Sequence, residues 1–209
     1  MKKILALAVG ALIVLAAAPA PKAAAAVPNI WPTYSKGAHV SYKGMLDECL
    51  RVELFLTTSN TTIYAPEGVI TASDHGEGSL DIRDTCNLAL PECEDECEDL
   101  EPVPTMILSA GLKPTRGPNM NATTMATASY RENMRVFSDK VARIQFTINW
   151  QATDPEVSTF EHERNEYGLW LRAHAERKAR ATFTVVAGDF SFTKSTKKSL
   201  IWQSFYTQL

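Results

Sequence analysis

The sequence predicts an all-β protein, a single antiparallel β-sandwich domain, and three observations carry this prediction. Apolar residues alternate with polar ones in run after run, as in half-buried strands whose successive side chains leave opposite faces of a sheet. β-Branched and aromatic residues dominate these runs. Helical spacing of apolar residues is weak. About nine strands at modest spacing in one domain are typical of a β-sandwich.

Residues 1–26 have the three-part pattern of a secretory signal peptide. Two lysines give a positive start, residues 4–18 form an apolar run, and the small residues 23–26 suit a signal peptidase, with cleavage expected after Ala26. An uncleaved membrane anchor is the less favoured alternative, because the run is short against the roughly 20 residues that span a bilayer. We therefore expect a bacterial protein that is secreted or periplasmic, with no stable membrane span in the mature chain.

The rest of the chain is expected to fold as one unit. Residues 27–37, which contain Pro28 and Pro32, are predicted to form an irregular lead-in, and residues 38–209 a single β-sandwich domain. A chain of this length can bury about 70 % of its unfolded surface, so a real core is expected. The net charge of −3 gives no reason to expect a nucleic-acid partner.

Each expected strand is marked by apolar residues two positions apart. The segment 153–166 has few of them and is predicted to be a short helix or a long loop. Residues 92–104 and 113–121, marked by proline or charge, are predicted to be loops. The apolar series are Val52, Leu54 and Leu56; Leu80, Ile82 and Cys86; Ile144, Phe146, Ile148 and Trp150; Leu169, Leu171, Ala173 and Ala175; Ala181, Phe183 and Val185; and Leu200, Trp202 and Tyr206.

Four cysteines in a chain that is expected to be exported favour disulfide bonds. Of the three possible pairings we favour Cys49–Cys86, which would join two predicted strands, together with Cys93–Cys97, which requires the chain to turn. Loop entropy gives the first bond on the order of 3–4 kcal/mol and the second about 2 kcal/mol. A metal site built from these thiols is the alternative, but no histidine lies near Cys93 in the sequence.

The segment 92–101 is the most acidic part of the chain. Clustered carboxylates can hold calcium, but this segment has neither the spacing of an EF-hand loop nor a glycine. We prefer a solvated loop held by the small disulfide, with calcium binding or the docking of a basic partner as alternatives, and we expect no other cofactor. The candidate metal ligands are Glu94, Asp95, Glu96, Glu98 and Asp99.

Cationic residues gather towards the C-terminus. Such a patch could contact an acidic polymer, an anionic membrane surface or the acidic segment 92–101 itself. On alternating strands the same residues form the solvated faces opposite Phe183 and Val185, which is the interpretation we prefer. They are Arg172, Arg177, Lys178, Arg180, Lys194, Lys197 and Lys198.

No catalytic motif is complete, and no catalytic residue is assigned. His162 and Glu163 open a run like H-E-x-x-H, but Glu166 stands where the second histidine ligand is needed. His75 and Ser79 lie close in sequence, yet a serine nucleophile also needs a base within hydrogen-bond reach and a third group that orients it. A glycine-bounded turn explains that segment as well.

The tryptophans differ in whether they fall on the apolar or the opposite positions of the alternating pattern. Trp150 and Trp202 follow the apolar alternation and are expected in the core. Trp170 has the opposite parity to its leucine neighbours and is expected on the other face of the sheet. Because a tryptophan on a flat sheet face can stack on a sugar ring, Trp170 is the candidate ligand contact.

Several segments together resemble a group of exported bacterial proteins that have no characterised activity. The resemblance covers roughly residues 49–203 and implies an all-β exported fold, but it carries over no substrate and no functional residue. The acidic segment with Cys93 and Cys97 is an addition of this chain. The segments are Glu48-Cys49, Val52-x-Leu54, Asp84-Thr85-Cys86, residues 142–150 and Arg177-Lys178-Ala179-Arg180-Ala181.

Two classes of function stay open. We prefer an exported, non-enzymatic β-sandwich protein that binds a glycan, a protein or a surface. The alternative is a small extracellular hydrolase with a site assembled from distant residues. A row of exposed aromatic side chains favours binding, whereas a pocket in which His75 or His162 meets two carboxylates favours an enzyme.

Overall fold

The computed structural model describes residues 31–65, 68–89, 101–138, 140–165 and 168–208, without the side chains of residues 70–74 and 165. These residues form ten β-strands and no helix. None of the described segments is a helix long and apolar enough to cross a membrane. The strands are β1 (Thr33–Met45), β2 (Leu50–Ala65), β3 (Gly68–Ala89), β4 (Val103–Leu112), β5 (Asn119–Met120), β6 (Thr127–Arg135), β7 (Arg143–Ala152), β8 (Val157–Asn165), β9 (Gly168–Ala187) and β10 (Phe190–Gln208).

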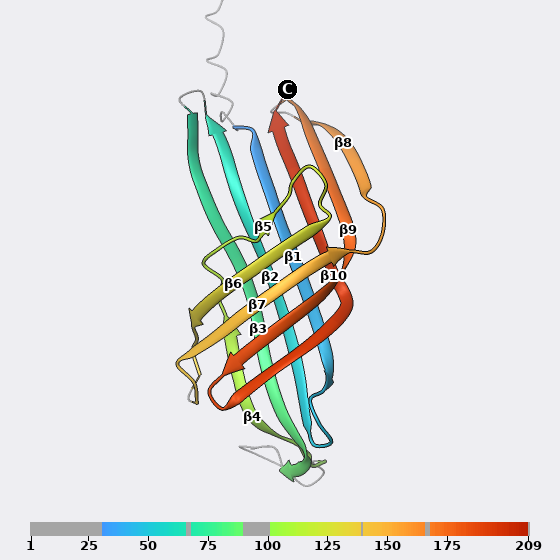
Figure 1. Ribbon diagram of the computed structural model, residues 1–209. Helices are drawn as coiled ribbons and strands as arrows, with labels where there is room; N and C mark the ends of the chain where they lie inside the picture. Colours follow the sequence, from blue (N-terminus) through green and yellow to red (C-terminus); the bar gives the residue numbers. More distant parts are fainter. Residues whose placement is uncertain (1–30, 66–67, 90–100, 139, 166–167, 209) are drawn as a thin grey trace, which may run out of the picture.

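All ten strands belong to one antiparallel sheet in the order β4-β3-β2-β1-β10-β9-β7-β6-β5, with β8 paired to β9. This sheet folds over on itself into two layers (Figure 1). The first layer holds β1 to β4, β8 and the adjoining parts of β9 (residues 168–176) and β10 (residues 199–208). The second layer holds β5, β6, β7 and the remaining parts of β9 and β10, and it crosses in front of the first. The predicted all-β sandwich is thus confirmed.

β9 and β10 are the strands that pass from one layer to the other. Their pairing slips between Thr196 and Ser199, where β10 carries a bulge. A bulge bends its strand and increases the local twist, which is how a strand turns the corner between two packed sheets. Two side chains at this corner bond across to β1 and the turn after it: the Thr196 hydroxyl donates to the Ser41 carbonyl (3.0 Å) and the Lys194 ammonium to the Leu46 carbonyl (3.4 Å).

The core lies between the layers and includes the predicted alternating residues of β2, β7 and the second part of β9, whereas Leu169 at the start of β9 is exposed. Val52, Leu54 and Leu56 of the first layer are buried, and so are the second-layer residues listed below. Phe183 packs edge-on against Tyr42 at a ring distance of 5.3 Å. The indole N–H of Trp150 donates to the His39 carbonyl of β1 at 2.9 Å and ties the two layers together. The buried second-layer residues of β7 and β9 are Ile144, Phe146, Ile148, Trp150, Ala179, Ala181, Phe183, Val185 and Ala187.

Four details differ from the sequence-based expectations. β1 begins at Thr33, inside the predicted lead-in, and β8 replaces the predicted helix or loop at 153–166. Residues 169–175 and 181–185 belong to one strand, β9, instead of two. In β10 it is Ile201 that is buried, whereas Trp202 and Tyr206 lie on the outer face, because the bulge shifts the alternation by one residue. The expectation that Trp202 lies in the core was therefore wrong.

The Cys49–Cys86 disulfide is present, as predicted, with 5.1 Å between its Cα atoms. It joins the start of β2 to the far end of β3. Beside it, the Thr85 hydroxyl donates to the Cys49 carbonyl at 2.7 Å. Cys93 and Cys97 lie outside the described residues.

The connection between β4 and β5 is held against the second layer by one carboxylate. Glu132 on β6 accepts hydrogen bonds from the Tyr130 hydroxyl and from the backbone N–H of Thr115 (3.1 Å). Burial and the neighbouring carboxylate raise the pKa of Tyr130, which therefore stays a protonated donor at neutral pH. These contacts keep residues 113–118, predicted as a loop, close to the sandwich.

Candidate functional site

The predicted metal ligands and catalytic pairs do not form a site among the described residues. Glu94, Asp95, Glu96, Glu98 and Asp99 lie outside them. Where the structure is described, the group of possible metal ligands is Cys49, Asp84 and Cys86, and its two thiols are already joined in the disulfide. A disulfide sulfur is not the thiolate that metal binding requires.

In each of the two histidine motifs, the geometry of the strand keeps the histidine and its partner residue apart. His75 and Ser79 are four residues apart on β3, so their Cα atoms are roughly 13 Å apart at the usual rise per strand residue. His162 and Glu163 are neighbours on β8 and therefore point to opposite faces of the sheet. The hollow lined by His75 contains one carboxylate, that of Glu77. Among the side chains that the structure describes, neither motif brings a histidine and two carboxylates together.

The outer face of the first layer, turned away from the core, carries three pairs of aromatic rings. Trp170 of β9 and Tyr206 of β10 are stacked, with ring centres 5.2 Å apart and planes 13° apart. His174 and Trp202 form a second stacked pair on the same strands at 6.4 Å. His39 of β1 and Phe55 of β2 form the third pair at 5.1 Å. We call these six residues the aromatic band; it crosses four neighbouring strands, β9, β10, β1 and β2.

A glycine lets one of these rings lie flat. A Cβ atom at Gly37 would come within 2.4 Å of a ring atom of Trp202, so the indole rests directly on the backbone of β1. Packing against the backbone holds the ring in one orientation, which lowers the entropy that a ligand contact would otherwise cost.

Trp170 lies on the outer face, as its parity predicted. Its side chain is 4 % exposed, while Tyr206, stacked on it, is 39 % exposed. Tyr206 is therefore the ring that solvent reaches, and Trp170 stacks against it from the adjacent strand. Tyr206 was expected in the core as a member of the apolar series with Leu200 and Trp202. Beyond the bulge this whole series has outer-face parity, and Ile201 faces the core instead.

A hollow of about 470 Å³ opens beside this stacked pair. Glu161 and Glu163 of β8 line one side, and Arg172 of β9 lies between them and Tyr206. All three charged side chains are exposed. An aromatic ring flanked by carboxylate and guanidinium groups offers one apolar surface together with hydrogen-bond acceptors and donors.

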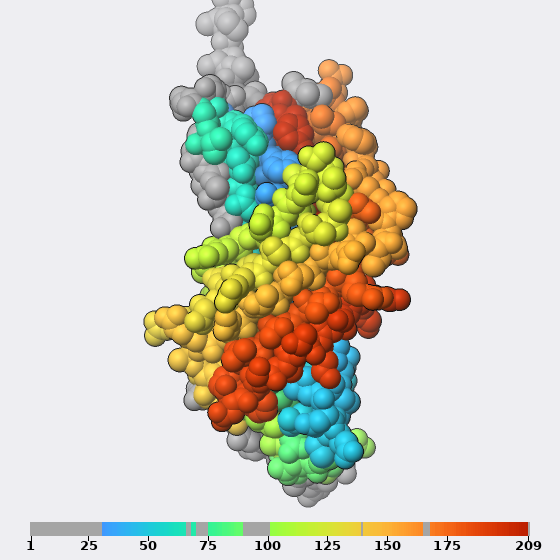
Figure 2. Space-filling model, in the orientation of Figure 1, coloured from blue at the N-terminus to red at the C-terminus, as the bar shows by residue number. Residues whose placement is uncertain are grey.

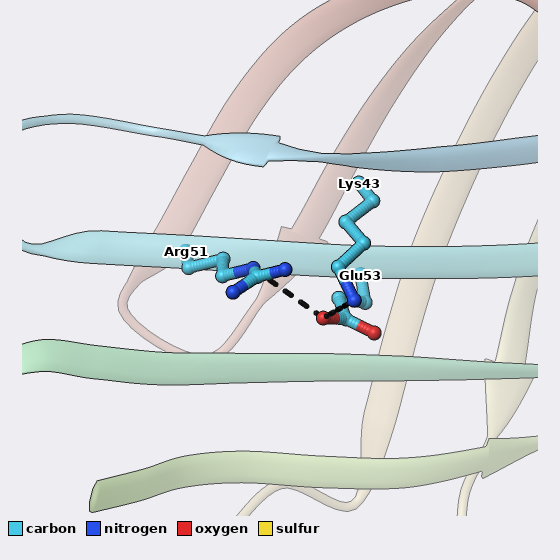
Figure 3. A network of polar contacts seen from close by, with 3 residues as sticks. All are labelled: Lys43, Arg51 and Glu53. Carbon is cyan, nitrogen blue, oxygen red and sulfur yellow. Dashed lines mark ion pairs between the residues drawn. The ribbon is translucent and has the colours of Figure 1, made fainter. Parts of the chain in front are cut away.

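The far end of the band is polar. Partial burial lowers the pKa of His39, so its ring is neutral at neutral pH. Beyond Phe55 on the same face, Glu53 lies 2.8 Å from the ammonium of Lys43 and 3.4 Å from Arg51 (Figure 3). The hydrogen bond from Lys43 holds the pKa of Glu53 below its usual value. The positive charges on this part of the face are thus balanced by a carboxylate.

Two further hollows lie elsewhere on the molecule. A space of about 200 Å³, lined by Tyr34, Phe160 and Phe205, opens between β8 and β1 on the core side of the first layer. A larger hollow of about 660 Å³ lies on the outer face of the second layer. Its lining includes Asn119, Asn149, Gln151, Arg180 and Thr182.

The fold and its faces define a two-layer, disulfide-bonded β-sandwich with an aromatic band on one outer face and a polar face on the other. No family model matches the chain, and no curated protein and no solved structure matches it either.

Proposed function

We propose that the protein is an exported, non-enzymatic binding module that holds a neutral glycan on its aromatic band. The observation that carries this proposal is the placement of three ring pairs on a sheet face that takes no part in the core. Phe55 and Tyr206 of this band are exposed outside the core, and clustered exposed apolar surface is typical of interaction sites.

The chemistry of the band suits a sugar ring. The apolar C–H face of a pyranose packs on the flat face of an aromatic side chain, while its hydroxyl groups need donors and acceptors at the edge. Tyr206 supplies the exposed ring, and Glu161, Glu163 and Arg172 supply the polar groups around the adjoining hollow. The extension of the band over four strands suits a chain of several sugar units better than a single one.

Export is supported by the cross-link and by the leader. Disulfides persist in oxidising compartments, so the Cys49–Cys86 disulfide supports a location outside the cytosol. The signal-peptide pattern of residues 1–26 supports the same location. Binding is favoured over catalysis because, in the described hollows, neither His75 nor His162 lies beside two carboxylates.

Tyr206→Ala tests the proposal. We expect the purified protein to bind insoluble cellulose, chitin or a soluble β-glucan, and the variant to bind the same polymer about tenfold more weakly, since about 1.4 kcal/mol of stacking is lost. Phe160→Ala is the matched control, because Phe160 is also exposed (73 %) and lies on β8, on the far side of β9 from Tyr206, but faces the other side of the sheet. It should bind like the wild type.

Three outcomes oppose the proposal. The wild type binds none of the three polymers; Tyr206→Ala binds as tightly as the wild type; or Phe160→Ala loses the binding instead, which assigns the ligand to the smaller hollow on the core side. Thermal unfolding of each variant shows whether a loss of binding reflects a loss of folded protein.

A further inference from the structure

We propose that the outer face of the second layer is a separate binding site for an acidic polysaccharide. This polar face consists of the outward side chains of β6, β7, the second part of β9 and the first part of β10, all at least partly exposed and brought to the front in Figure 2. They are Thr127, Ser129, Arg131, Asn133, Arg135, Arg143, Gln145, Thr147, Asn149, Gln151, Arg180, Thr182, Thr184, Val186, Ser191, Thr193 and Ser195.

The charge of this face is of one sign. Its charged members are all arginines, and no carboxylate stands at any of the outward positions just named. The whole chain, by contrast, has a net charge of −3. On the outer face of the first layer the cations Lys43 and Arg51 share Glu53 (Figure 3). A positive face on an acidic protein attracts an anionic partner.

Apart from Val186, the remaining side chains of the polar face are uncharged donors and acceptors in register. Asn119, Ser129, Asn149, Thr182 and Ser195 face one another across five neighbouring strands, and the hydroxyls of Thr182 and Ser195 are 3.1 Å apart. In a nearby row, the hydroxyls of Thr184 and Thr193 are 2.8 Å apart. These amides and hydroxyls can exchange hydrogen bonds with sugar hydroxyls.

The hollow of about 660 Å³ lies among these residues. Arg180 and Gln151 line it from adjacent strands, with Asn149 one row further along. A guanidinium beside amides can bind a carboxylate or sulfate group with two parallel hydrogen bonds while the amides bind the neighbouring hydroxyls. The site therefore suits a sugar that carries an acidic group.

The same residues disfavour the other acidic partners. No aromatic side chain occurs among the outward positions of the polar face, so exposed bases of a nucleic acid would have nothing on which to stack. Val186 is the one apolar side chain at these positions, whereas binding in a membrane interface requires an apolar surface that can be buried there. A hydroxylated, acidic polymer fits both the charge and the hydrogen-bonding groups.

This site is independent of the aromatic band, since it lies in the other layer and takes a charged ligand. The test measures binding of the purified protein to immobilised heparin, which is sulfated, and to polygalacturonate, which carries carboxylates, with neutral dextran as the reference. Arg131→Gln/Arg180→Gln should weaken binding to at least one acidic polymer about tenfold. Lys43→Gln/Arg51→Gln removes the same charge from the other layer and should change it less than about twofold.

If the protein binds heparin but not polygalacturonate, the site recognises sulfate; if it binds polygalacturonate but not heparin, the site recognises carboxylate. The proposal is overturned if the wild type binds neither acidic polymer better than dextran, or if both double variants lose binding equally, which indicates attraction by net charge alone. It is also overturned if single-stranded DNA or vesicles of anionic phospholipid bind as well as the acidic polysaccharides. Tyr206→Ala should leave this binding unchanged, so failure here leaves the glycan proposal for the aromatic band untouched.

Discussion

Replacing Trp150 with alanine is expected to lower the free energy of unfolding by about 3–5 kcal/mol, the usual cost of removing a large aromatic side chain from a core. Trp150 is 1 % exposed and lies on β7 in the second layer. Its removal leaves a cavity between the layers. It also leaves the His39 carbonyl on β1 without the indole donor that now lies 2.9 Å away.

Urea unfolding followed by circular dichroism measures this loss. Trp150→Phe is the control, because it keeps an aromatic ring in the core and removes the indole N–H; it should cost less than the alanine variant. If Trp150→Ala stays within about 0.5 kcal/mol of the wild type, as a surface substitution would, then Trp150 does not join the two layers.

Removing the Cys49–Cys86 disulfide is expected to cost about 4 kcal/mol, because the cross-link closes a long loop in the unfolded chain. The bond joins the start of β2 to the end of β3, next to the paired residues Leu50 and Asp84. The variant Cys49→Ser/Cys86→Ser should unfold at a clearly lower urea concentration than the wild type.

The single variants provide an internal check. Cys49→Ser and Cys86→Ser each remove the same bond, so each should be about as unstable as the double variant, and the two effects should not add. Additive losses, or a double variant as stable as the wild type, would contradict the role given to this cross-link. Thiol titration of the folded wild type should find neither Cys49 nor Cys86 reactive.

The strands that face the core on one side could be predicted from the sequence, because burial imposes a period of two. Ile144, Phe146 and Ile148 are all fully buried. β8 could not be predicted in this way. It lies at an edge and is exposed on both faces, so Val157 and Phe160 stand among polar residues with no alternating pattern. A strand without a buried face leaves no periodic signal.

The outward residues were harder to place. The bulge between Thr196 and Ser199 reverses the parity of β10, and nothing in the run of polar residues around it marks the extra residue. Trp202 and Tyr206 were therefore assigned to the wrong face, although the parity of Trp170 was interpreted correctly. The ring pairs depend on cross-strand register, which alternation in one segment does not specify. The polar face, by contrast, has a signal in the sequence: alternate residues of 127–135 and 143–151 include no acid.

One sheet folds over at β9 and β10, so that the second layer covers the core side of the first and both outer faces lie outside the core. The most direct test is the indole N–H resonance of Trp150 in an NMR spectrum of the folded protein. We predict slow exchange with solvent and nuclear Overhauser contacts to the backbone protons of His39 and Val40 on β1. An indole proton that exchanges as fast as an exposed one, with no contact to β1, would contradict the two-layer arrangement.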